Sequence, residues 1–233
     1  MKIALVQMDV AHGQPAENVK HVKEMLKRAL DDNPDVIVLP EMWNTGYALD
    51  ELDGIADKDG LESQALLSHF AREHAVAILG GSVAIEKDDK FYNTTYVYNK
   101  FGDLINTYSK VHLFGLMAED QYMSAGAKES VFELDGVTAA SVICYDIRFP
   151  EWVRTQMAQG VKVLFVVAVN RVGAGPEDVF SGHSMVIDPL GNVVLQAKEH
   201  EEGIFTADIN LEEVDRVRGQ IPVFEDRRTD LYH

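Results

Sequence analysis

Short apolar runs of strand length alternate with amphipathic helical segments along this chain, and this alternation limits the possible folds more than any other feature. The first run covers residues 2–8 and is followed by residues 18–30, where apolar side chains recur at helical spacing. A second run, residues 36–40, precedes another such helix at residues 61–73. Strand–helix units of this kind predict layered α/β architecture.

The remaining apolar runs predict further strands and two hairpins. One hairpin pairs residues 91–98 with residues 104–109 around a turn that contains Gly102. Pro150 is expected to open a short helix, because proline is favoured in the first helical turn. Other strands are expected at residues 75–85, 137–144, 161–169 and 203–209, with the second hairpin over residues 183–197. No linker or repeat divides the chain, so residues 1–233 are predicted to form a single domain.

The charge balance limits the classes of partner. The chain carries 21 Lys and Arg residues against 38 Asp and Glu residues, a net charge of −17. Such a field repels phosphate backbones and anionic membranes, so we expect neither nucleic acid nor a membrane as a partner. The single cysteine excludes an internal disulfide and fits a reducing compartment. The first residues lack the features of a signal peptide, and the expected location is cytoplasmic.

Three reactive side chains follow or close predicted strands. Glu41 follows "VIVLP", Lys110 follows "LINTYS", and Cys144 closes "TAASVIC". Open α/β sheets place their ligand crevices at the carboxyl ends of strands. We therefore expect these three side chains to converge on one site.

A thiol, a carboxylate and an ammonium group together can cleave an amide without a metal or a serine. A thiol with its ordinary pKa of about 8.5 is mostly protonated at neutral pH and needs a base before it attacks a carbonyl. Glu41 can take that proton, and Lys110 can neutralise the oxyanion that forms. Taken singly, each residue also fits an ordinary role, as a buried cysteine, a solvated acid or a solvated cation.

The strings around these residues resemble the signature blocks of the nitrilase superfamily of carbon–nitrogen hydrolases. The strings are "LPEMWNTGY" around Glu41, "YSKVHLFG" around Lys110 and "CYDIRFPEW" around Cys144. The resemblance covers nearly the whole chain and implies a four-layer αββα sandwich, usually paired into dimers, with no cofactor and no metal. It also implies that Glu41 is the general base, Lys110 the oxyanion stabiliser and Cys144 the nucleophile that forms a thioester.

The same resemblance implies roles for further residues. Glu119, in "LMAEDQYMSAG", is similar to a second glutamate that the family places beside the lysine. The backbone N–H of Tyr145 is implied as a second oxyanion donor, and Tyr47 is predicted to contact the substrate. Cys144 is expected to end its strand at a sharp turn that exposes the thiol, while the helix opened by Pro150 favours negative charge nearby.

The string "CYDIRFPE" is similar to the ω-amidase branch of the family, which hydrolyses the side-chain amide of 2-oxoglutaramate or 2-oxosuccinamate. A substrate with a carboxylate end needs a cation in so acidic a protein, and Arg148 and Arg154 are the candidates. Either arginine could instead pair with an acid as a structural bridge. The alternatives for function are a nitrile, a carbamoyl compound or another amide as substrate, or a catalytically impaired member that acts as a binding protein.

One departure from the family pattern lies near residue 168. Family members usually continue after "VLFVVA" with a loop, a long helix and another strand, whereas here "VKVLFVVA" runs directly into "VNRVG". About 25 residues are absent, which matches one helix, one strand and their connections. We therefore expect the sandwich to lack one helix and one strand, with weakened dimerisation and reduced activity.

Overall fold

The largest sheet of the computed structural model, which describes residues 1–167, 169–176 and 178–231, has eight strands. Its order is β15-β1-β2-β4-β6-β5-β3, and β7 pairs with the remaining edge of β6. The strands are β1 (Lys2–Gln7), β2 (Val36–Val38), β3 (Asp57–Lys58), β4 (Ala77–Leu79), β5 (Val83–Lys87), β6 (Lys90–Tyr98), β7 (Leu104–Ser109) and β15 (Gly203–Asp208).

The centre of this sheet is parallel and buried on both faces. β1, β2 and β4 pair in parallel, while β15 runs antiparallel to β1 and β6 runs antiparallel to β4, β5 and β7. Parallel strands that are covered on both faces consist of continuous apolar runs, which explains why the apolar runs in the sequence predicted these strands. The predicted hairpin of β6 and β7 is confirmed, with Gly102 in its turn at a φ of 78°.

The strands that face this sheet form three smaller groups. β8 (Val131–Leu134), β9 (Val137–Ile143) and β10 (Val163–Val167) form a three-stranded sheet, in which β10 runs parallel to β9. The two other groups are the antiparallel pairs β11 (Val172–Ala174) with β12 (Val179–Ser181) and β13 (Met185–Ile187) with β14 (Val193–Gln196). Apolar side chains from β9, β10, β13 and the eight-stranded sheet share one buried cluster, so the sheets pack face to face.

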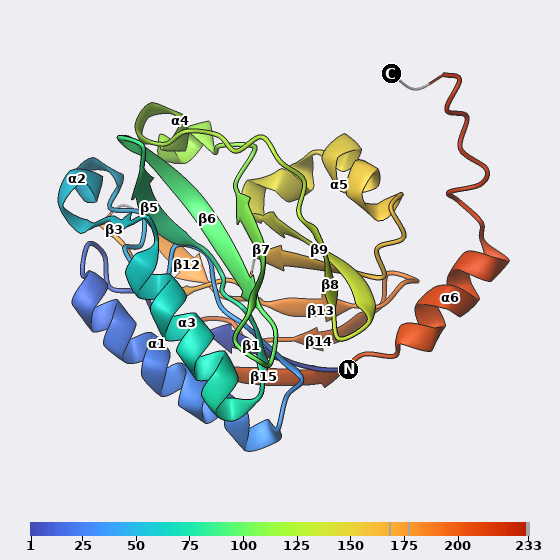
Figure 1. Cartoon of the computed structure of the whole chain (residues 1–233), viewed down its shortest axis with the longest axis horizontal. Coiled ribbons are helices and arrows are strands. Elements are labelled where there is room, and N and C mark those ends of the chain that lie inside the picture. Colours follow the sequence, from blue (N-terminus) through green and yellow to red (C-terminus); the bar gives the residue numbers. More distant parts are fainter. Residues whose placement is uncertain (168, 177, 232–233) are drawn as a thin grey trace.

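Helices complete the layers. α1 (Pro15–Ala29) and α3 (Leu61–His74) cover the outer face of the eight-stranded sheet, and α5 (Pro150–Met157) packs against β9 on the other side (Figure 1). α6 (Leu211–Gln220) lies at the periphery, and α2 (Leu52–Ile55) and α4 (Glu119–Tyr122) are single turns. The fold is the expected α/β sandwich of helix, sheet, sheet and helix. No helix within the described residues combines the length and apolar character that a membrane span requires.

The single strand predicted over residues 75–85 is wrong. β4 ends at Leu79 and β5 begins at Val83, because the chain turns sharply at Gly80 and Gly81. Gly81 has a φ of 59°, and a Cβ there would lie 2.1 Å from the carbonyl oxygen of Pro40. Only glycine tolerates both the conformation and the close approach. This turn packs directly against the segment that carries Glu41.

The second sheet is incomplete on one side of β10. Among the described strands, β10 pairs with β9 along one edge and with none along the other. The neighbouring hairpin of β13 and β14 exposes Met185, Ile187 and Val193 to solvent. A free edge and an uncovered apolar face agree with a sandwich that lacks one strand and one helix at this place.

Candidate active site

The structure brings Glu41, Lys110 and Glu119 into direct contact, although they lie on three different segments. The Lys110 Nζ donates to Glu41 Oε1 at 2.9 Å and to Glu119 Oε2 at 2.7 Å. Glu41 follows β2, Lys110 follows β7, and Glu119 is the first residue of α4. Lys110 and Glu119 are 0% exposed and Glu41 is 8% exposed. The cation therefore sits between two carboxylates in a nearly closed site.

The charges in this cluster shift the pKa values of Lys110 and Glu119. Burial alone would lower the pKa of Lys110, but the charges of Glu41 and Glu119 outweigh burial and raise it above its ordinary value. Burial, together with the negative charge of Glu41, raises the pKa of Glu119, while Lys110 opposes this shift. Glu119 Oε2 also accepts from the backbone N–H of Phe114 at 2.7 Å. Lys110 therefore stays positively charged at neutral pH.

Cys144 lies at the point where β9 ends. β9 closes at Ile143, and Cys144 opens the short 3-10 turn η4 (Cys144–Arg148) with a φ of 43°. This left-handed conformation is uncommon outside glycine and re-aims the side chain at the strand end. The thiol is partly exposed and lies beside Glu41, whose charge acts on its pKa. The expected sharp turn is present, one residue earlier than predicted.

The groups around Cys144 keep the resting thiol protonated, and the expectation that the helix opened by Pro150 favours negative charge nearby stays a prediction. Burial raises the pKa of the Cys144 thiol, and the negative charge of Glu41 raises it further, while Lys110 opposes the shift. The helix α5 begins only at Pro150, beyond the η4 turn. The thiol is therefore protonated at neutral pH and needs a base before it can attack a carbonyl.

A buried carboxylate, Asp146, connects the Lys110 segment to the Cys144 turn. Asp146 accepts from the Tyr108 hydroxyl at 2.6 Å and from the backbone N–H of Ile143 at 3.0 Å. It also contacts His112 twice, through the backbone N–H at 2.9 Å and through Nδ1 at 2.8 Å. Asp146 thus fixes the residues on both sides of the site relative to one another.

Replacing Asp146 by alanine is expected to destabilise the protein by about 3 kcal/mol, which lowers the melting temperature by about 6 to 12 °C. The reason is that several donors would stay buried without an acceptor. Thermal unfolding followed by circular dichroism measures the shift, and Asp53→Ala in α2 is the matched control because Asp53 is exposed. Equal melting temperatures for the two variants would contradict this assignment.

The residues expected to contact the substrate lie in different surroundings. Burial raises the pKa of Tyr47 well above its ordinary value, and the charges of Glu41 and Cys144 raise it further, so its hydroxyl lies beside both. The Tyr47 ring also stacks on Phe180 at 6.0 Å. Tyr145 packs its ring against Phe114 at 4.8 Å. The roles of Tyr47 and Tyr145 toward a substrate stay predictions.

Neither candidate arginine pairs with an acid among the described residues. Arg148 is exposed at the end of η4 and makes no ion pair or hydrogen bond there. Arg154 lies on α5, and its guanidinium carbon sits 5.1 Å from the centroid of the Phe224 ring. Arg154 is therefore part of a stacked contact with the C-terminal segment, whereas Arg148 remains available to a ligand.

Asn93 is a buried member of the cluster that the sequence did not single out. Its Nδ2 donates to Glu41 Oε1 at 2.9 Å and to Glu119 Oε1 at 3.1 Å. Asn93 sits in β6 and is 0% exposed. A polar residue in a strand with both faces covered is the one signal that could have pointed to it.

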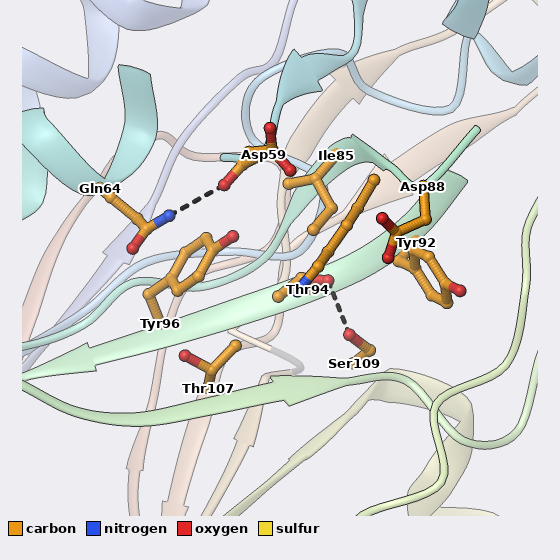
Figure 2. A pocket seen from close by; sticks show the side chains of 10 residues that line it. Asp59, Gln64, Ile85, Asp88, Tyr92, Thr94, Tyr96, Thr107 and Ser109 are labelled. Carbon is orange, nitrogen blue, oxygen red and sulfur yellow. Dashed lines mark hydrogen bonds between the residues drawn. The ribbon is translucent and has the colours of Figure 1, made fainter. Parts of the chain in front are cut away.

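A groove of about 450 Å³ is lined by side chains of β6 and of the segments around it (Figure 2). Thr94 and Tyr96 line it, and the Thr94 hydroxyl bonds Ser109 at 2.9 Å. Successive residues of a strand point to opposite faces, so Thr94 faces the groove while Asn93 faces Glu41. β6 therefore separates this groove from the catalytic cluster. No group of three or more His, Cys, Asp or Glu in the described part of the chain is arranged to hold a metal ion.

Comparison with known proteins gives the family of the chain. The family model described as carbon–nitrogen hydrolase matches residues 2–166 and residues 163–219. The chain belongs to the carbon–nitrogen hydrolase family. The resemblance seen in the sequence is confirmed.

Individual carbon–nitrogen hydrolases resemble the chain over their full length. The 2-oxoglutaramate amidase of Bacillus subtilis (strain 168) is 42% identical over 257 aligned positions, which cover 99% of this chain and 98% of that protein. The omega-amidase NIT2 of Danio rerio is 31% identical, covering 99% of this chain and 96% of that protein. The crystal structure of Saccharomyces cerevisiae Nit3, a member of branch 10 of the nitrilase superfamily, superposes with a TM-score of 0.87 at 25% identity, covering 98% and 96% of the two chains.

Two features of these matches concern the segment that this carbon–nitrogen hydrolase lacks. The 257 aligned positions exceed the 233 residues of the chain by 24. The two matches to the family model also overlap at residues 163–166, which lie in β10. Residues 163–166 thus correspond to two separate places in the family pattern, and the missing segment lies between those places.

Proposed function

We propose that this carbon–nitrogen hydrolase cleaves the ω-amide of a 2-oxo dicarboxylic acid monoamide, of the 2-oxoglutaramate type, and releases ammonia through a thioester on Cys144. The observation that carries the proposal is the contact of Glu41, Lys110 and Glu119 beside the Cys144 thiol. The 42% identity to a 2-oxoglutaramate amidase supports the substrate class.

The first half of the reaction forms the thioester. Glu41 takes the proton of the Cys144 thiol while the sulfur adds to the amide carbon, and the carbonyl electrons move to oxygen. Lys110 has three N–H donors, of which two bond Glu41 and Glu119. The third is left for the oxyanion, together with the backbone N–H of Tyr145. Glu41 then passes its proton to the nitrogen, the C–N bond breaks, and ammonia leaves.

The second half returns the thiol. A water molecule attacks the thioester carbon while Glu41 takes one of its protons, and Lys110 again stabilises the oxyanion. The C–S bond breaks, Glu41 returns the proton to the sulfur, and the new carboxylic acid leaves and gives its own proton to the solvent. Each proton that Glu41 takes is delivered again, so the cycle consumes only amide and water.

Ammonia release from a panel of substrates tests this function. We expect 2-oxoglutaramate and 2-oxosuccinamate to be hydrolysed faster than a neutral aliphatic amide, a nitrile and an N-carbamoyl amino acid. Preference for the nitrile or the carbamoyl compound would assign another carbon–nitrogen substrate. Binding of 2-oxoglutaramate without any ammonia release would instead identify a catalytically impaired binding protein.

Arg148 is the proposed partner of the substrate carboxylate. Arg148→Ala is expected to raise KM for 2-oxoglutaramate about tenfold or more, because a charge-assisted hydrogen bond is lost, and to change KM for a neutral amide of similar size by less than about twofold. Arg154→Ala, which removes a cation stacked on Phe224, is the matched control. An equal rise in KM for both substrates in Arg148→Ala would show that this residue has a structural role instead.

We also infer that the enzyme works in the cytoplasm as a single-domain protein and forms a homodimer weakened by the missing segment. The single cysteine and the net charge of −17 support a reducing compartment and a small-molecule substrate rather than nucleic acid or a membrane. The exposed apolar face of the β13 and β14 hairpin supports a contact between subunits that has lost part of its cover.

A further inference from the structure

Asn93 links the two carboxylates of the catalytic cluster through one amide nitrogen. Nδ2 donates to Glu41 Oε1 at 2.9 Å and to Glu119 Oε1 at 3.1 Å. Lys110 spans the same two carboxylates through Nζ. The four side chains therefore form a closed ring in which two donors alternate with two acceptors.

The orientation of the amide follows from chemistry. The opposite orientation would place the amide oxygen against two carboxylates, where no hydrogen bond could form. The nitrogen must therefore face Glu41 and Glu119. The amide oxygen then points away from them, and it has no hydrogen-bond donor among the described atoms although it is buried.

The ring distinguishes the two oxygens of Glu41. Oε1 accepts from both Lys110 Nζ and Asn93 Nδ2, so both of its lone pairs are engaged. Cys144 and Tyr47 lie beside the Glu41 carboxylate, and burial together with the charge of that carboxylate raises the pKa of both side chains. The remaining oxygen, Oε2, is left for them. Oε2 is therefore the oxygen that can take the thiol proton.

We propose that Asn93 is a positioning residue that locks Oε1 of Glu41 in the ring and reserves Oε2 for the proton of Cys144. A second cation in place of Asn93 would neutralise the base, and an apolar residue would leave Glu41 Oε1 and Glu119 Oε1 each without one of their donors. A neutral double donor holds both carboxylates without removing their charge. This inference rests on the proposed function for its kinetic test.

Asn93→Ala is expected to lower kcat by about ten- to a hundredfold with KM changed by less than about twofold, because the base is misplaced while substrate contacts remain. The acid limb of the pH profile of kcat/KM is expected to move up by about one unit, since a carboxylate that loses a donor holds a proton more tightly. The charged and titratable groups around Glu41 that stay in place are Lys110, Glu119, Cys144 and Tyr47.

Two variants keep the test decisive. Asn93→Asp has nearly the same shape but replaces the donor by a third carboxylate, so kcat should fall further and the acid limb should move further up. Thr95→Val is the matched control on the same face of β6. Its hydroxyl is buried and has no partner among the described atoms, so the variant should leave the pH profile unchanged.

Alkylation of Cys144 by iodoacetamide across the same pH range gives a readout that needs no amide substrate. We expect the acid limb of alkylation in Asn93→Ala to shift by the same amount as that of kcat/KM. An unshifted acid limb in both alanine and aspartate variants would overturn the proposal and assign Asn93 to packing. A rise in KM with kcat unchanged would also overturn the proposal. A shifted alkylation profile in a protein that releases no ammonia would uphold the role of Asn93 and reject the proposed function.

Discussion

Replacing Cys144 by alanine is expected to abolish ammonia release, by a factor on the order of ten thousand or more, because the sulfur that forms the thioester is gone. The chain has no second cysteine that could take its place. The fold should survive, because the thiol is partly exposed and its loss removes little buried area. Alanine meets the φ of 43° at this position with the same Cβ as cysteine, so no new strain arises.

Mass spectrometry of the intact protein identifies the intermediate directly. The unmodified enzyme, mixed briefly with 2-oxoglutaramate and quenched with acid, should carry an acyl group that Cys144→Ala lacks. Melting temperatures of the two proteins serve as the control for folding. A near-normal rate in Cys144→Ala, or a rate that depends on added metal ions, would reject the thiol mechanism.

Replacing Glu41 by glutamine is expected to lower kcat by a hundredfold or more, since the group that moves the proton is removed. The ring around Oε1 predicts how the new side chain sits. Lys110 and Asn93 both donate to this oxygen, so the glutamine oxygen takes its place and the amide nitrogen faces Cys144. That nitrogen has no lone pair that accepts a proton under these conditions.

The pH dependence separates this loss from a general disturbance. The acid limb of kcat/KM, which reports protonation of the base in the free enzyme, should vanish in Glu41→Gln. Glu51→Gln is the control, because Glu51 is exposed and lies outside the cluster. Activity of Glu41→Gln within about tenfold of the unmodified enzyme would show that another group takes the proton of Cys144.

The sequence predicted the location of the three main catalytic candidates because each lies at the end of a strand. Apolar runs mark buried strands, and the first polar residue after such a run marks the sheet edge. Glu41 obeys this rule, whereas Lys110 follows the mixed run "LINTYS" and Cys144 closes the run "TAASVIC". The strand over residues 75–85 failed because its apolar character continues through Gly80 and Gly81, where the backbone turns. Hydrophobic periodicity does not reveal a turn that lies inside an apolar run.

The partners of Asn93 and Asp146 could not be predicted, for a different physical reason. Their partners lie far away in the sequence: Asn93 bonds a carboxylate 52 positions earlier, and Asp146 bonds a hydroxyl 38 positions earlier. Such contacts depend on how separate segments pack. Local propensity and spacing carry no information about them. The exposure of Arg148 is likewise set by the course of the chain after η4.

Residues 163–166 of β10 match the family pattern twice, and this overlap has a consequence for how the protein divides its tasks. The cluster of Glu41, Asn93, Lys110 and Glu119, together with Cys144, precedes that junction. The chain beyond it supplies the last strands, α6 and the Phe180 ring that stacks on Tyr47. This division agrees with the absence of one strand–helix unit, and Phe165 and Val167 of the single strand that remains face the interior. The residues proposed for proton transfer and those proposed to contact the substrate therefore all precede the junction, and the shortened part of the chain reaches the site only through packing such as that of Phe180 on Tyr47.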